Sequence, residues 1–157
     1  IRQGSSLVPI SAQLLPLEMI RVGVFADHYS EAITAAGDLL VDAGITKPAY
    51  TDSMIRVVEE LGPYIVLVEG VALAHAAPGD EVTANGLSVV SLKNPVDFGN
   101  GKLARLVIAL AALNHDAHIE TLGALAELLG EPEILEALIN SETASEIHSL
   151  LTSTRGE

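Results

Sequence analysis

Cysteine is absent from the 157-residue sequence, and basic residues are few. Without a thiol the chain forms no disulfide, binds no zinc through cysteine and has no cysteine nucleophile. Eight Lys and Arg residues stand against 21 Asp and Glu, which gives a formal net charge of −13. Because contacts to nucleic-acid phosphates need clustered basic side chains, this balance argues against nucleic-acid binding. It is compatible with docking onto basic protein surfaces.

Long apolar runs are also missing. The best of them, residues 103–113, is interrupted by Arg105 and is too short to cross a bilayer. The first residues lack the basic start and the small-residue cleavage site of a secretory signal. We therefore expect a cytoplasmic protein that does not itself span a membrane.

Two common catalytic signatures do not occur. No glycine-rich loop ends in Lys-Ser or Lys-Thr, so the chain has no visible apparatus for nucleotide hydrolysis. The Gly-x-Ser-x-Gly turn of serine hydrolases is absent too. Carboxylates are plentiful, but most fall on the expected helix faces, where solvated charge explains them.

The apolar content is high, since 49% of the residues are hydrophobic. A chain of this length and composition buries a substantial core and is not expected to be disordered. No internal repeat, low-complexity tract or long linker divides the sequence. We expect one domain over residues 1–157, with residues 1–13 as a lead-in of uncertain order.

Periodicity predicts an alternation of helices and strands. Residues 7–17 are predicted as a short helix or an extended lead-in stopped by Pro16, and Asp27 or Ser30 is expected to cap the first long helix. The Thr143-Ala144-Ser145-Glu146 capping box is expected to open the last one. The expected strands are 20–25, 64–68, 71–74 and 87–92, and the expected helices are 30–43, 49–61, 116–129, 132–139 and one after the capping box.

Residues 103–112 are apolar apart from Arg105, and periodicity alone does not distinguish a buried strand, a buried helix or a strand running into a helix. We favour a strand at the start, because the segment follows the Gly99-Asn100-Gly101 turn. Helices thus flank a central block of strands. The pattern predicts an α/β fold with a central mixed β-sheet sandwiched by helices on both faces.

His75 is the most informative residue. A strand-like run of small and branched residues delivers its imidazole to a turn closed by Pro78 and Gly79. The next two side chains, Ala76 and Ala77, are no larger than alanine, so a bulky partner or an anion can approach the ring. An imidazole can serve as a nucleophile, a general base or a metal ligand, although most histidines in such places simply pack or face water.

Two further histidines, His115 and His118, lie three positions apart and share a face if their segment is helical. A metal clip with His75 as the third ligand is one interpretation. Exposed polar residues at a helix N-terminus are the other. His28 and His148 are isolated in the sequence, and a structural role explains them.

A wider pattern connects these residues. The chain resembles the enzyme IIA components of the bacterial phosphoenolpyruvate-dependent sugar phosphotransferase system, in the mannitol/fructose class and its ascorbate branch. The order and spacing of the matching segments extend from about residue 14 to about residue 152. The matching segments are Ser30-Glu31-Ala32-Ile33, residues 37–41, Tyr50-x-x-x-Met54, residues 62–66, Val71-Ala72-Leu73-Ala74-His75-Ala76, residues 86–92, Pro95-Val96-x-Phe98, and Leu110-Ala111-Ala112 followed by His118.

The resemblance implies a function. It implies a mannitol/fructose-type enzyme IIA fold in which His75 accepts a phosphoryl group from the phosphocarrier HPr. The group then passes to a cysteine of an enzyme IIB partner, and through it the chain serves a membrane IIC transporter. His118 matches the family's second histidine, which lies beside the first and supports the phosphoryl group. The resemblance implies no cofactor or metal. It leaves open whether the chain forms a homodimer.

Two positions depart from the family pattern. Ala74-His75-Ala76 stands where many relatives have Pro-His-Gly, and Asn114 stands where ascorbate-branch relatives often have an acidic residue. Two other functions stay open at this point. One is a regulatory domain of the same fold that keeps the phosphorylatable histidine, and the other is a histidine-based metal-binding protein.

Overall fold

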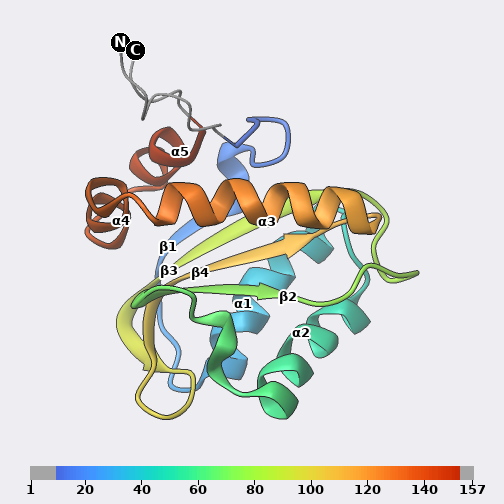
Figure 1. Ribbon diagram of the computed structural model, residues 1–157, viewed down its shortest axis with the longest axis horizontal. Helices are drawn as coiled ribbons and strands as arrows, with labels where there is room; N and C mark the ends of the chain where they lie inside the picture. Colours follow the sequence, from blue (N-terminus) through green and yellow to red (C-terminus); the bar gives the residue numbers. More distant parts are fainter. Residues whose placement is uncertain (1–9, 153–157) are drawn as a thin grey trace.

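The computed structural model describes residues 10–152, and its strands form a four-stranded mixed sheet. Five α-helices and two 3-10 helices complete this part of the chain (Figure 1). The strands are β1 (Ile20–Val24), β2 (Gly70–His75), β3 (Gly86–Asp97) and β4 (Leu103–Ala111). The helices are η2 (Leu17–Met19), α1 (Tyr29–Asp42), α2 (Pro48–Leu61), η3 (Pro63–Ile65), α3 (His115–Leu129), α4 (Pro132–Ile139) and α5 (Ala144–Thr152).

The sheet has the strand order β1-β3-β4-β2. The outer strands run parallel to their neighbours, β1 with β3 and β2 with β4, whereas the two central strands are antiparallel. Helices α1 and α2 cover one face and α3, α4 and α5 lie over the other (Figure 1). The predicted fold class, a mixed sheet sandwiched by helices in an α/β protein, is confirmed.

Periodicity did not decide between a strand and a helix for residues 103–112, and the structure has strand β4 there. It pairs with β3 on one side and β2 on the other, and its residues from Leu106 to Ala111 are all buried. A central strand covered by helices on both faces has no polar side, so its sequence shows no alternation. Residues 103–111 therefore form one strand.

Two local predictions are wrong. The expected strand over residues 64–68 is replaced by η3, because Gly62 turns the chain at φ +88° and Pro63 opens a 3-10 turn closed by a bond from Val66 N to the Pro63 carbonyl. The N-cap of α1 is His28, not Asp27 or Ser30, since the His28 side chain accepts the N–H of Ser30.

The helix ends otherwise follow the sequence signals. Gly44 has the left-handed φ of +76° that ends α1. The capping box before α5 forms, with Glu146 N bonded to Thr143 Oγ1 and Thr143 N bonded to Glu146 Oε1. Of the expected lead-in, residues 1–9 lie outside the described residues, and the chain from Ile10 to Pro16 makes turns rather than a helix.

Candidate functional site

His75 is the last residue of β2, an edge strand of the sheet. The four residues before it are buried, while His75 itself is half-buried. Its register partner on β4 is Leu110. After His75 the chain leaves the sheet, and Pro78 cannot extend the ladder because it lacks an N–H group. The sequence therefore presents the imidazole at the edge of the core.

The His75 ring has a fixed orientation. Its Nδ1 lies 2.9 Å from the backbone carbonyl oxygen of Leu73. A carbonyl oxygen only accepts hydrogen bonds, so Nδ1 must hold the proton of the neutral ring. The lone pair then resides on Nε2. This arrangement leaves Nε2 as the nucleophilic nitrogen.

His118 is the fourth residue of α3, and polar side chains fix the start of this helix. Asn114 caps it by accepting the N–H of Ala117 at 2.8 Å. Asn85 Oδ1 accepts the N–H of Leu113 at 2.7 Å, which holds the loop before the helix. The amide at position 114 thus performs a capping role, which needs an oxygen acceptor but no charge.

The structure brings the rings of His75 and His118 together. Their centroids lie 5.3 Å apart and the ring planes are inclined by 55°. The parallel pairing of β2 with β4 explains the convergence, because both strands end at the same edge of the sheet and only three residues separate β4 from α3. Two imidazoles far apart in sequence therefore share one site.

The surroundings of His118 disfavour its charged form. Burial lowers the pKa of His118, and the neighbouring imidazoles of His75 and His115 lower it further. Its Nδ1 is buried and has no hydrogen-bond partner within residues 10–152. Because a proton on Nδ1 would lack an acceptor there, the geometry favours the proton on Nε2, where it can be donated. The lowered pKa disfavours a protonated, charge-assisting His118 in the free protein.

Tyr50 of α2 anchors the backbone beside His75. Its hydroxyl lies 2.6 Å from the Leu110 carbonyl oxygen and accepts the N–H of Ala76 at 3.1 Å. The Ala76 N–H is therefore already engaged and is not available to a ligand. Sequence reasoning noted Tyr50 only as part of the family pattern, because its hydroxyl contacts arise from residues distant in the chain.

The other histidines do not complete a metal site. His115 is exposed at the start of α3, and His28 caps α1 at the opposite end of the sheet. No group of three His, Asp or Glu side chains that could hold a metal ion occurs among residues 10–152. The three-histidine clip considered from the sequence does not form.

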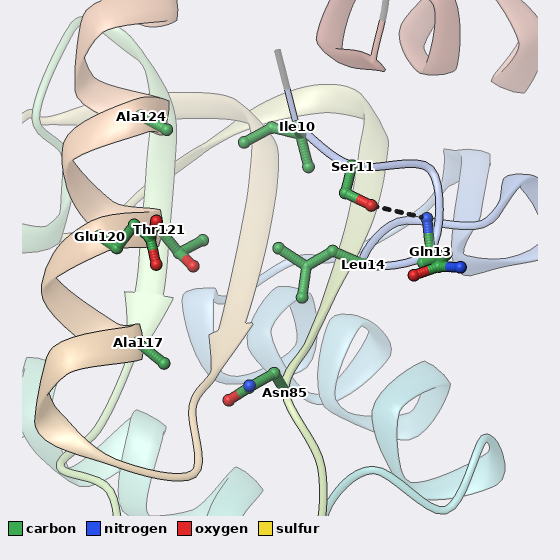
Figure 2. Close-up of a pocket in the computed structure, with 9 residues that line it drawn as sticks. All are labelled: Ile10, Ser11, Gln13, Leu14, Asn85, Ala117, Glu120, Thr121 and Ala124. Atoms are coloured by element: carbon green, nitrogen blue, oxygen red, sulfur yellow. Dashed lines mark hydrogen bonds between the residues drawn. The ribbon is translucent and has the colours of Figure 1, made fainter. Parts of the chain in front are cut away.

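A separate cavity of about 460 Å³ lies on another side of α3 (Figure 2). Ala117, Thr121 and Ala124 of the helix face Ile10 and Leu14 of the lead-in across it. Neither His75 nor His118 lines this cavity. The imidazole pair therefore lies outside it, and both histidines are partly exposed.

The helices of residues 10–152 fall short of what a bilayer crossing requires. None of them combines the necessary length with the necessary apolar character.

The fold agrees with the comparisons with known proteins. The sequence profile of the family described as "Phosphoenolpyruvate-dependent sugar phosphotransferase system, EIIA 2" matches residues 13–154. The chain belongs to this family, and a phosphocarrier role in sugar phosphotransfer follows from the membership.

Individual members of the family are similar to this chain over most of its length. The chain is 30% identical to the ascorbate-specific PTS system EIIA component of Escherichia coli K12 over 138 residues, which are 86% of this chain and 90% of the relative. The solution structure of the mannitol-specific cryptic enzyme IIA of Escherichia coli matches with a TM-score of 0.79 and 30% identity, over 96% of this chain and 99% of that one. The Escherichia coli complex of mannitol enzyme IIA with phosphorylated enzyme IIB matches with a TM-score of 0.77 and 31% identity, over 87% and 96% of the two chains.

Proposed function

We propose that this chain accepts a phosphoryl group from HPr on Nε2 of His75 and passes it to a cysteine of an enzyme IIB partner. The observation that supports this assignment most directly is the bond from His75 Nδ1 to the Leu73 carbonyl oxygen, which leaves Nε2 free beside His118. In this proposal the molecule works in the cytoplasm and serves a membrane IIC transporter through enzyme IIB.

The first step is a displacement at phosphorus. The Nε2 lone pair of His75 forms the new N–P bond while the bond between phosphorus and the donor breaks, and the donor keeps that electron pair. The transition state is loose and its charge is spread over the phosphoryl oxygens, so catalysis depends on positioning and on hydrogen-bond donors. In this proposal the Nε2–H of His118 is such a donor.

The N-terminal end of α3 adds to this stabilisation. His118 lies in the first turn of the helix, so the positive end of the helix dipole is close to the group carried by His75. Screening is strong beyond about 8 Å at physiological salt. These local donors therefore outweigh distant carboxylates, despite the net charge of −13.

The second step needs another molecule. A thiolate attacks phosphorus, an S–P bond forms, the N–P bond breaks and His75 recovers its lone pair. This chain contains no cysteine, so the acceptor must lie on a partner. The complex of mannitol enzyme IIA with phosphorylated enzyme IIB supports such a partner by similarity. Exposed Leu113 and Ile119 flank His118 in the sequence and offer apolar contact area.

Phosphorylation with purified components tests the proposal. Incubation with phosphoenolpyruvate, enzyme I and HPr should add one acid-labile phosphoryl group to the wild type, as measured by intact mass. His75→Ala should add none, and His28→Ala, a histidine variant at the other end of the sheet, should label normally. Labelling of His75→Ala at the wild-type level would refute the site. Labelled wild type that transfers to no ascorbate-type enzyme IIB would refute the second step and favour the regulatory alternative.

A further inference from the structure

The hydroxyl of Tyr50 lies between the ends of the two strands that lead to the histidines. Tyr50 is 1% exposed and belongs to α2, which covers one face of the sheet. Its oxygen lies 3.1 Å from Ala76 N, 3.2 Å from Ala76 O and 2.6 Å from Leu110 O. One hydroxyl thus contacts both β4 and the residue that follows β2.

The Tyr50 hydroxyl takes the place of a backbone hydrogen bond at the point where the pairing of β2 with β4 ends. The pairing of β2 with β4 stops at His75 and Leu110, so Ala76 has no strand partner. The Ala76 N–H donates to the Tyr50 oxygen, and the single hydroxyl proton goes to the closest acceptor, the Leu110 carbonyl. The ends of β2 and β4 are thus joined through a side chain of helix α2.

This contact determines backbone geometry at the site. The Ala76 N–H belongs to the peptide group that follows His75, so holding it fixes the torsion between the Cα and carbonyl carbon of His75. Leu110 precedes the short connection to α3, which carries His118. Burial raises the pKa of Tyr50, so the hydroxyl keeps its proton and its donor role across the physiological range.

We propose that Tyr50 is a positioning residue whose hydroxyl fixes the placement of His75 relative to His118 for phosphoryl transfer. The inference rests on the proposed function. Tyr50 has no hydrogen bond to either imidazole, so it acts through the backbone. Misplacement of reacting groups by about 1 Å costs on the order of 100-fold in rate, so a small shift of the ring suffices for a measurable effect.

Tyr50→Phe removes the hydroxyl and keeps the buried ring. We expect the kcat for transfer from phosphorylated HPr to fall about tenfold while KM stays unchanged, because partner docking is unaffected. Ser88→Ala is the matched control, since Ser88 is fully buried and donates to the Ala36 carbonyl of α1 at 2.7 Å. It should lose thermal stability and keep its kcat. An unchanged kcat in Tyr50→Phe, or an equal loss in Ser88→Ala, would overturn the proposal.

Nuclear magnetic resonance of the ring nitrogens separates positioning from general stability. In the wild type the Nδ1–H of His75 should be protected by its bond to Leu73, and in Tyr50→Phe that signal should shift or broaden. An identical His75 signal in the two proteins would contradict the inference. This measurement needs no phosphoryl donor, so it tests the positioning claim even if wild-type labelling fails and the proposed function falls.

A measurement on the wild type covers the case in which Tyr50→Phe does not fold. The hydroxyl proton of Tyr50 should exchange slowly with solvent, because it is buried and bonded. Tyr64, whose side chain is 78% exposed, is the internal control and should exchange fast. Equally fast exchange at both hydroxyls would show that the contact between the strand ends does not persist.

Discussion

His28 and His75 lie at opposite ends of the sheet and use the same ring atom in opposite ways. His28 Nδ1 accepts the N–H of Ser30 at 3.1 Å, so the proton of its neutral ring must be on Nε2. His75 Nδ1 instead donates to the Leu73 carbonyl at 2.9 Å, so its Nε2 is unprotonated. His28 stacks on Tyr29 with a centroid distance of 4.2 Å, whereas His75 faces His118 at 5.3 Å.

The difference shows that the hydrogen-bond partner, more than exposure, determines what a histidine can do. His28 is the more exposed of the two, yet its lone pair is engaged as a helix cap. His75 is half-buried but has a free nucleophilic nitrogen next to a second imidazole. The following predictions test whether this contrast is functional.

Removal of the second imidazole should have the largest effect. In His118→Ala, transfer to His75 should slow about 100-fold, because a donor aimed at the developing charge is lost, while His75 still becomes labelled. His115→Ala is the control on the same helix and should retain its rate, since His115 is exposed. Rapid-quench kinetics with phosphorylated HPr measures both. Equal rates for His118→Ala and the wild type would remove His118 from the site.

Removal of His28 should affect stability and leave chemistry unchanged. His28→Ala deletes the N-cap of α1 and should lower the free energy of unfolding by about 1 kcal/mol. His28→Asn restores an acceptor and should recover most of that loss. Urea denaturation and the transfer assay should be performed on the same samples. A transfer defect in His28→Ala would contradict the assignment of His28 to a structural role.

The smallest expected effect concerns the pKa of His118 and the dependence of stability on pH. Its pKa should lie below the usual 6.5, chiefly because of burial and secondly because of His75, so His75→Ala should raise it. Since the folded chain binds this proton less tightly than the unfolded chain, the free energy of unfolding should fall as the pH drops below about 6.5. NMR titration of the ring protons measures the shift. A lower pKa of His118 in His75→Ala than in the wild type would contradict this prediction.

Local sequence signals predicted the elements whose causes are local. The helix ending at Gly44 and the capping box of Thr143 and Glu146 depend on residues a few positions apart, and both form. The predicted strand over residues 64–68 failed because apolar residues were assumed to be buried. Tyr64 is 78% exposed and Leu67 is 47% exposed, so no sheet holds them.

The candidate site likewise combines features that local sequence predicts with features that depend on residues distant in the chain. The sequence pattern placed His75 at the end of a strand and His118 near a helix start, and the structure places them so. Their convergence follows from the parallel pairing of β2 with β4, which no short-range pattern encodes. The resemblance to the enzyme IIA family supplied that link. The contacts of Tyr50 with Ala76 and Leu110 were not predictable, because they join residues 26 and 60 positions apart.

The measurement that tests the central claim most directly is ¹⁵N and ³¹P NMR of the protein labelled by phosphoenolpyruvate, enzyme I and HPr. We predict a ¹⁵N–³¹P coupling to Nε2 of His75, with the proton on Nδ1 retained in its bond to the Leu73 carbonyl. A phosphoryl group on Nδ1, or on any histidine other than His75, would contradict the account.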